Sequence, residues 1–370
     1  MLAPGDLAHW FGGRSTALPK LMFETLAGRY VVLSFIGSST YAPSRQLIED
    51  VEREQARFDV LNCCFCGVSV DVNDEKQGRL RQKFPGIMYF WDLDRSVSRL
   101  YGAVDENGQY CAHSLLLDPD LRVLSVIPFR GDNRGHIARI FESLAMFPPT
   151  VSLNHFAPVL MLPHVLEPQL CKELIDVYRR DGGEELGILR EADGQTVRAH
   201  DHDVKRRRDC TIMDQAMIAT LVDRMRRRVY PEMKKAFQFR ATQIERFVIG
   251  CYDADNGGYF RPHRDDQTRG SAHRRFAVTV GLDASAYEGG DLRFPEFGFR
   301  MYRAPTGCAI VFSCTLMHEV RPVTRGKRYA LLPFIYDDEA AKIRDANQQF
   351  LGNSLPSEVC LNPRFNEHHA

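Results

Sequence analysis

The sequence predicts a chain of two unlike parts, an α/β first half and a mainly β second half. In the first half, short apolar runs that suit buried strands alternate with segments whose apolar residues recur at helical spacing. In the second half, short apolar runs follow one another with Gly, Pro and Asp between them, which is typical of a β-sandwich or jelly roll. A length of 370 residues allows two or three domains, each with a sizeable core.

The α/β prediction for the first half depends on the order of its apolar segments. Apolar runs predict strands at residues 30–36, 60–70, 114–117 and 123–127. Helices are predicted at about 44–58 and about 134–147, where the residues on the apolar faces are Ile48, Val51, Phe58, Ile137, Ile140, Phe141 and Leu144. Pro148 and Pro149 end the second helix, so we expect a domain boundary near residue 150.

The second half opens with helices and continues as strands. A strand is predicted at 157–163, a helix from Glu167–Pro168, a polar loop-rich segment at 183–209 and a helix at about 214–230 that Pro231 kinks or ends. Further strands are predicted at 244–252, 275–282, 291–294, 308–312, 316–320 and 328–336. We therefore expect an α/β domain (1–150), a helical lead-in with a loop (151–240), a jelly roll (241–345) and a tail (346–370). The loop at about 182–209 is a candidate lid.

Composition excludes several classes of protein. The chain has 48 Lys and Arg against 48 Asp and Glu, so bulk charge gives no attraction to nucleic acid or anionic membrane. No run of about 18 apolar residues is present, which argues against a membrane span. The ten cysteines are sparse and the N-terminus lacks a signal-peptide pattern, which predicts a cytoplasmic protein with reduced thiols. Cys63, Cys64 and Cys66 are expected in a strand core, with a thiol-redox role as the alternative.

The feature with the clearest chemistry is His263-Arg264-Asp265. On an extended backbone, residues i and i+2 point to the same face, so His263 and Asp265 can reach one metal ion. His318, near the end of a predicted strand, can supply a second imidazole from elsewhere in the chain. Two histidines and one carboxylate on one face of a metal are the ligand set of non-haem Fe(II) oxygenases.

The first half resembles the peroxiredoxins (AhpC/TSA type), which have a thioredoxin-like fold. The matching segments are Leu26–Phe35, Gly67–Asp71, Leu100–Val104 and Leu115–Pro119. The cysteine that attacks peroxide in that family follows a threonine by three residues, but here Thr40 is followed at that spacing by Pro43. The arginine expected six residues before Asp118 falls on Ala112. The resemblance therefore implies a thioredoxin-like domain without peroxidase chemistry, which can serve as a docking site for a protein partner.

The second half resembles the Fe(II)/2-oxoglutarate dioxygenases, in particular the prolyl-hydroxylase-like branch. The matching segments are Tyr252…Gly257–Asp265, Tyr287–Phe294, Pro305–Phe312 and His318–Arg328. The resemblance implies a double-stranded β-helix (jelly roll) with His263, Asp265 and His318 on iron. It also implies Arg328 on the 5-carboxylate of 2-oxoglutarate and Tyr252 beside that cosubstrate. Lys327 faces the other side of the same predicted strand and is disfavoured for this role.

The same resemblance implies the reaction and its cofactors. Fe(II), 2-oxoglutarate and O₂ are required, with ascorbate as a reductant, and the products are succinate, CO₂ and a hydroxylated substrate. The sequence leaves two classes of substrate open, a small molecule or a protein side chain. Alternatives are a non-catalytic scaffold with a degenerate oxygenase fold, or a thiol-redox protein that uses the first domain.

Two further groups of residues have a structural and a functional interpretation. The basic run Lys205–Arg208 and the cluster Arg224, Arg226, Arg227, Arg228, Lys234 and Lys235 can be solvated surface or a nucleic-acid contact. The cluster lacks interleaved aromatic residues, and Phe334 stands where alkylation-repair dioxygenases have a second arginine, so nucleic acid is disfavoured. His200 and His202 flank Asp201 and are interpreted as loop residues, with a second metal site as the alternative.

Overall fold

The computed structural model describes residues 2–83, 85–148, 155–192 and 194–352, which divide into two compact units. The first unit contains the described residues up to 155 together with 294–300, and the second contains 156–293 and 301–352. The predicted boundary segment at 149–154 and most of the predicted tail, 353–370, lie outside the described residues. Within the described residues, no helix is both long enough and apolar enough to cross a bilayer.

The first unit contains a seven-stranded mixed sheet in the order β2-β1-β5-β4-β3-β6-β7. Strands β3, β4 and β5 run parallel, and the other pairings are antiparallel. The predicted strands are present with shifted ends, whereas β1, β2 and β5 were not predicted. The bounds are β1 Gly12–Ser15, β2 Leu21–Met22, β3 Tyr30–Gly37, β4 Cys63–Ser69, β5 Ile87–Trp91, β6 His113–Leu117 and β7 Val123–Pro128.

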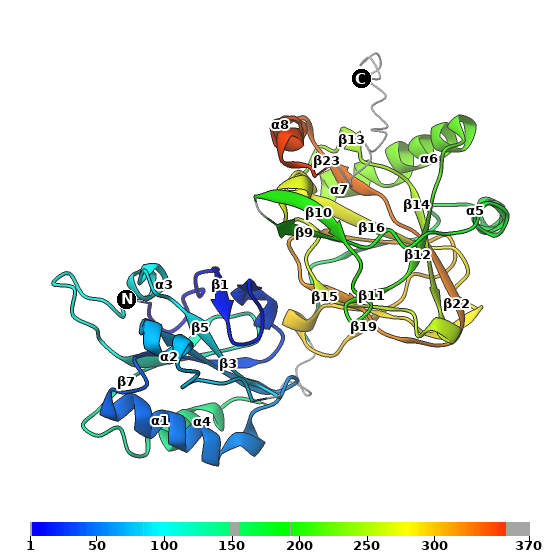
Figure 1. Cartoon of the computed structure of the whole chain (residues 1–370). Coiled ribbons are helices and arrows are strands. Elements are labelled where there is room, and N and C mark those ends of the chain that lie inside the picture. Colours follow the sequence, from blue (N-terminus) through cyan, green and yellow to red (C-terminus); the bar gives the residue numbers. More distant parts are fainter. Residues whose placement is uncertain (1, 84, 149–154, 193, 353–370) are drawn as a thin grey trace. The chain divides into compact units, whose positions relative to one another are not determined.

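Two amphipathic helices cover one face of this sheet. Figure 1 shows α1 (Ala42–Arg53) beside α4 (His136–Leu144), and their apolar residues join one core with β3, β4 and β5. Helix α1 begins two residues before the predicted position because Pro43 fits a first helical turn, where its missing N–H costs nothing. It ends at Arg53, so Phe58 reaches the core from beyond the helix. The short helices α2 (Val72–Lys76) and α3 (Ser96–Leu100) follow β4 and β5.

The second unit is dominated by two antiparallel sheets. One is five-stranded, in the order β11-β15-β21-β18-β19, and the other is nine-stranded, with the path β12-β14-β22-β16-β20-β8 and β13, β17 and β23 off that path. The bounds are β8 Leu160–Leu162, β11 Lys205–Arg206, β12 Arg208–Thr211, β13 Gln243–Ile244, β14 Val248–Asp253, β15 Tyr259–His263, β16 Phe276–Gly281, β17 Tyr287–Gly289, β18 Leu292–Arg293, β19 Met301–Tyr302, β20 Ala309–Ser313, β21 His318–Val320, β22 Val323–Leu331 and β23 Phe334–Tyr336.

Helices cover the outer face of the nine-stranded sheet. Apolar residues of α5 (Pro168–Asp181) and α6 (Gln215–Arg228) share one core with strands β14, β16, β20 and β22. Helix α6 ends before Pro231, as predicted, and Pro231 stands in the first turn of a further helix, α7 (Tyr230–Phe237), which was not predicted. Helix α8 (Asp338–Asn347) follows the last strand.

The segment 183–209, predicted to be loop-rich, is largely strand. It contains the hairpin of β9 (Ile188–Ala192) and β10 (Gln195–Ala199), followed by β11 and β12. The prediction was wrong because β9 and β10 are short strands whose side chains, apart from that of Thr196, are not fully buried, so their residues give no clear apolar alternation. The backbone N–H groups of Arg269 and Gly270 donate hydrogen bonds to the side chains of Glu191 and Thr196. These bonds connect the hairpin to the segment at residues 269–270 of the same unit.

Candidate functional site

The three residues predicted as metal ligands lie together in the second unit. His263 at the end of β15 stands directly opposite His318 at the start of β21, and Asp265 follows His263 by two residues. Asp265 Oδ1 lies 3.6 Å from His263 Nε2, and Oδ2 lies 3.4 Å from His318 Nε2. Ligand atoms bound at about 2.1 Å to one ion lie roughly 3 Å apart, so this spacing fits a single metal ion. Among the described residues, His263, Asp265 and His318 form a group whose ligand atoms all lie within 4.8 Å of one another, which is close enough to hold one metal ion.

Both imidazoles are held in the orientation that a metal needs. Nδ1 of His263 is 2.7 Å from the carbonyl oxygen of Arg261, and Nδ1 of His318 is 3.0 Å from that of Leu316. A ring that donates its Nδ1–H to a carbonyl keeps the lone pair of Nε2 free. The ring of Phe260 stacks on His263 with centroids 3.5 Å apart and fixes its plane. The two Nε2 atoms and the Asp265 carboxylate therefore converge as electron-pair donors.

The electrostatics of the cluster favour a cation. Burial lowers the pKa of His318 to about 4, so this ring is neutral near pH 7 and can act as a ligand. Burial by itself raises the pKa of Asp265, but the neighbouring His318 and His263 bring it below the ordinary value, so it is ionised. The ionised Asp265 offers a negative charge that a divalent ion can balance, and the neutral His318 ring offers it a lone pair.

A buried ion pair supports the backbone around Asp265. The Arg274 guanidinium makes two 2.7 Å contacts with the carboxylate of Glu245, whose side chain is 1% exposed, and His273 lies 3.1 Å from the same carboxylate. Arg274 also donates to the carbonyl oxygen of Asp265 at 3.4 Å, and the Asp265 N–H donates to Cys314 at 2.9 Å. The position of the carboxylate ligand thus depends on this pair.

Substituting Glu245→Gln is expected to lower the free energy of unfolding by roughly 3–5 kcal/mol at neutral pH. The substitution removes the carboxylate charge that balances the buried charge of Arg274. Although burial raises the pKa of Glu245, Arg274 brings it well below the ordinary value. Its stabilising effect is therefore present above the unfolded pKa of about 4.3 and is lost as the pH falls below it. Urea denaturation across this pH range measures both effects.

The exposed Glu339, paired with Lys342, provides the matched control for Glu245. Glu339→Gln is expected to change stability by less than about 1 kcal/mol. A Glu245→Gln protein as stable as the parent at neutral pH would contradict the assignment of a stabilising buried pair.

Arg328 and Tyr252 lie opposite each other on neighbouring strands of the nine-stranded sheet. They are paired residues of β22 and β14, and the guanidinium carbon of Arg328 lies 5.0 Å from the centre of the Tyr252 ring. Arg328 is 5% exposed, and its Nη1 has no hydrogen-bond partner among the described residues. A buried guanidinium nitrogen without a partner is costly, so the site favours an anionic ligand. Lys327 points away, is half exposed and pairs with Asp253 at 2.8 Å.

The Gly-Gly sequence at 289–290 makes room for Arg328. Gly290 has a φ of +66°, and a Cβ atom there would lie 3.0 Å from Cδ of Arg328 and 2.8 Å from Cγ2 of Val323. A side chain at this position would be strained and would press against the Arg328 stem. The glycine motif therefore serves the placement of the arginine.

The structure adds Arg207, which the sequence interpretation grouped with a basic surface run. Its guanidinium binds the buried Asp209 and donates to the hydroxyl of Tyr252 at 3.2 Å. Asp209 directly follows the basic run Lys205–Arg208. This acidic residue was the sequence signal that some of the basic side chains form ion pairs within the protein. Elsewhere, Arg224 and Arg228 of the second basic cluster bind Glu167.

The remaining candidate residues lie apart from the metal cluster. His200 contacts the carbonyl of Glu185 and His202 its carboxylate, and neither belongs to a metal-holding group among the described residues. Cys63, Cys64 and Cys66 are buried in β4, and burial raises the pKa of the Cys63 and Cys66 thiols. Pro43 lies in the first turn of α1, and Ser44 is fully buried with its hydroxyl donating to Ile36.

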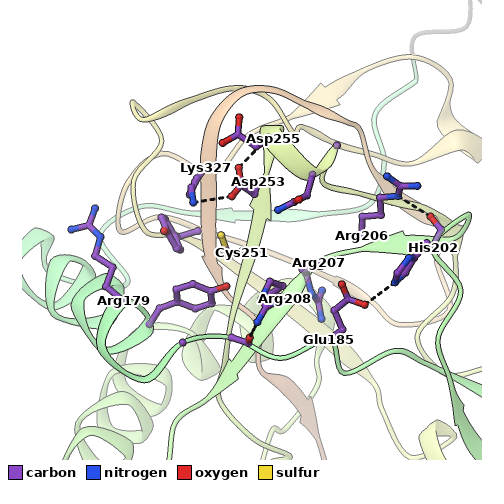
Figure 2. A pocket seen from close by; sticks show the side chains of 16 residues that line it. Arg179, Glu185, His202, Arg206, Arg207, Arg208, Cys251, Asp253, Asp255 and Lys327 are labelled. Atoms are coloured by element: carbon purple, nitrogen blue, oxygen red, sulfur yellow. Dashed lines mark hydrogen bonds and ion pairs between the residues drawn. The ribbon is translucent and has the colours of Figure 1, made fainter.

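A second concavity, of about 750 Å³, lies on the outer side of β14 and β22. Figure 2 shows its lining, which includes Arg179, Arg206, Arg208, Cys251 and Lys327. Cys251 and Lys327 each adjoin a residue of the Tyr252–Arg328 pair, and neighbours on a strand face opposite sides. This pocket therefore lies behind the sheet that carries Arg328 and does not contain the metal cluster.

Comparison with known proteins gives matches in both halves. The model of the 2OG-Fe(II) oxygenase superfamily matches residues 247–336, and that of the AhpC/TSA family matches residues 4–126. A PKHD-type hydroxylase of Pseudomonas fluorescens is 40% identical over 91 residues, covering 22% of this chain and 39% of that protein. One from Synechococcus sp. is 33% identical over 102 residues, covering 26% and 45%. The chain thus spans less than half the length of these curated relatives.

Solved structures also match each half. A prolyl-4-hydroxylase of Pseudomonas putida has 19% identity and a TM-score of 0.35, covering 49% of this chain and 92% of that one. A yeast mitochondrial 1-Cys peroxiredoxin has 19% identity and a TM-score of 0.33, covering 40% and 78%. On the family models, the first half of the chain is therefore similar to the AhpC/TSA family and the second half to the 2OG-Fe(II) oxygenase superfamily.

Proposed function

We propose that the protein is an Fe(II)- and 2-oxoglutarate-dependent oxygenase that hydroxylates a C–H bond of its substrate. In this proposal the two sheets of the second unit form a double-stranded β-helix. The observation that carries the proposal is the convergence of His263, Asp265 and His318 in a unit that also buries an unpaired guanidinium nitrogen at Arg328. A barrel that bound only a neutral ligand would not be expected to have both features.

The residues present fit both iron and 2-oxoglutarate. His263, Asp265 and His318 would hold the metal, and Arg328 would hold the distal carboxylate of 2-oxoglutarate in a forked pair of hydrogen bonds. When bound, iron and 2-oxoglutarate supply the oxidation, in which one oxygen atom of O₂ enters succinate, released with CO₂, and the other becomes the new hydroxyl group.

The chain's own side chains orient and shield this chemistry. The carbonyl contacts of His263 and His318 keep both rings turned toward the ion, and Phe260 limits rotation of His263. The buried Tyr252 ring lies against Arg328 and keeps water from its guanidinium. Reduced access of water strengthens the attraction between Arg328 and a carboxylate.

The proposal is tested with the full chain. Fe(II), 2-oxoglutarate and O₂ are expected to give succinate, with added ascorbate as a second arm that tests its role as reductant. Anaerobic calorimetry checks that iron and 2-oxoglutarate bind in a 1:1:1 complex. Iron binding without any 2-oxoglutarate binding or succinate formation would instead favour the non-catalytic scaffold.

We further propose that the first unit is a docking module for a protein partner and that the substrate is a small molecule or a protein side chain. The support for a non-peroxidase role is that Pro43 and Ser44 stand where the resemblance places the reactive cysteine.

The full-length protein is expected to consume hydrogen peroxide no faster than a Cys63→Ser variant, because the Cys63 thiol is 2% exposed and burial raises its pKa. Stopped-flow mixing with peroxide measures the rate. Rapid turnover that Cys63→Ser, Cys64→Ser or Cys66→Ser abolishes would instead establish a thiol peroxidase.

A further inference from the structure

Arg207 stands where the chain passes from one sheet of the second unit to the other. Strand β11, which ends at Arg206, pairs with β15 in the five-stranded sheet, and β12, which begins at Arg208, pairs with β14 in the nine-stranded sheet. The Arg207 guanidinium carbon lies 5.6 Å from the centre of the Tyr252 ring and 5.9 Å from that of Phe260. It is thus next to both aromatic residues that flank the candidate site.

Its neighbours in the basic run differ from it in exposure, although Arg207 lines the same outer pocket (Figure 2). Arg206 and Arg208 are exposed and line the outer pocket, where Arg208 contacts the carbonyl oxygen of Gly183 (Figure 2). Lys205, by contrast, is buried, and its Nζ lies 3.0 Å from Asp209. The run therefore divides into the buried Lys205 and the partly buried Arg207, which meet Asp209, and the exposed Arg206 and Arg208, which do not.

Asp209 fixes the Arg207 guanidinium. Nε and Nη2 of Arg207 lie 2.5 Å and 3.0 Å from the two oxygens of the fully buried Asp209 carboxylate. Although burial alone raises the pKa of Asp209, the charges of Arg207 and Lys205 bring it below the ordinary value. The carboxylate is thus ionised, and a two-point contact with it leaves the guanidinium little freedom to rotate.

The remaining nitrogen of this fork reaches Tyr252. Nη1 of Arg207 lies 3.2 Å from the Tyr252 hydroxyl oxygen. A guanidinium can only donate, so the phenol oxygen must accept this hydrogen bond. The hydroxyl proton is then left for another acceptor. Because Arg328 lies against the same ring, a carboxylate bound by Arg328 would bring oxygen atoms into the neighbourhood of that proton.

We propose that Arg207 is a positioning residue for the cosubstrate: held by Asp209, it fixes the Tyr252 hydroxyl so that this group donates its proton to an oxygen of 2-oxoglutarate. Arg207 does not itself touch the cosubstrate. This inference rests on the proposed function, since it assumes that 2-oxoglutarate binds beside Arg328.

The test measures the dissociation constant of 2-oxoglutarate by calorimetry, with Mn(II) replacing Fe(II) so that no turnover occurs. Tyr252→Phe is expected to weaken binding about tenfold, because it removes a hydrogen bond to a charged group. Arg207→Gln is expected to have an effect of similar size, because it releases the Tyr252 hydroxyl from its fixed orientation. The double variant is expected to bind no more weakly than Tyr252→Phe, because Arg207 acts only through that hydroxyl. Arg207→Lys, which keeps the charge beside Asp209, is expected to restore part of the affinity.

Arg208→Gln is the matched control, since Arg208 is the next residue and lines the same outer pocket as Arg207, but it contacts the carbonyl oxygen of Gly183 instead of Tyr252. It is expected to leave the dissociation constant within twofold of the parent value. Melting temperature and Mn(II) affinity are measured for each variant, and Arg207→Lys replaces Arg207→Gln in the cycle if the glutamine variant is unfolded.

Two outcomes would overturn the inference while leaving the proposed function intact. One is a parent protein that binds 2-oxoglutarate and a folded Arg207→Gln variant that binds it equally well. The other is a double variant whose loss equals the product of the two single losses, which would mean that Arg207 and Tyr252 act independently. A parent protein that binds no 2-oxoglutarate would instead contradict the proposed function itself.

Discussion

Substituting His318→Ala is expected to weaken metal binding at least about 100-fold and to abolish succinate formation, because it leaves two of the three protein ligands. In the proposed site, His318 would contribute its Nε2 from a strand separate from that of His263, and no other side chain among the described residues belongs to the same group. Metal content after dialysis and calorimetric titration with Fe(II) under anaerobic conditions measure the loss. His263→Ala is expected to behave in the same way.

His202→Ala is the control for this prediction. His202 is an exposed histidine that pairs with Glu185 at 2.7 Å and lies outside the metal cluster. Its substitution is expected to leave one equivalent of iron bound with unchanged affinity. Retention of full metal affinity in His318→Ala would show that the three side chains do not share an ion. Loss of a second equivalent in His202→Ala would revive the alternative of a further metal site.

Substituting Arg328→Ala is expected to raise the KM for 2-oxoglutarate about 100-fold, with a much smaller effect on kcat. Removal of one partner of a buried charge pair costs roughly 2–5 kcal/mol, and about 3 kcal/mol corresponds to this factor. The variant loses binding of the carboxylate distant from the metal, so saturating 2-oxoglutarate is expected to recover most of the turnover rate. Succinate formation over a range of 2-oxoglutarate concentrations separates the two constants.

The neighbouring residue Lys327 is the control for Arg328. It carries the same charge, but it faces away, is half exposed and pairs with Asp253. Lys327→Ala is expected to change the KM by less than about threefold, because exposed ion pairs contribute little. Equal effects of the two substitutions would mean that net charge rather than a specific contact attracts 2-oxoglutarate.

Local sequence rules predicted the residue types of the candidate site and the faces on which they lie. The spacing of His263 and Asp265 places both side chains on one face of an extended segment, and strand alternation separates Arg328 from Lys327. The longer apolar runs predicted strands, and Pro168 falls in a first helical turn as predicted. These features depend on contacts between near neighbours in the chain, which a sequence pattern records.

Other features were not predictable because they depend on which segments pair. The hairpin of β9 and β10 and the two-residue strand β11 are too short or too polar to give a clear period. The contact of Arg207 with Tyr252 joins residues 45 positions apart in the chain. The residues near the run Lys205–Arg208 do not indicate which of its side chains are buried, because the burial of each side chain depends on the strands that pair with this segment.

By itself, then, the sequence determined the chemistry available: two imidazoles, a carboxylate and an arginine in an order that a known superfamily shares. Only the tertiary structure decided that His263 stands opposite His318, that Tyr252 stands opposite Arg328, and that Asp209 holds Arg207 beside them. The physical reason is that strand register is fixed by pairing and burial across the whole unit, and a shift of one residue would turn each side chain to the other face.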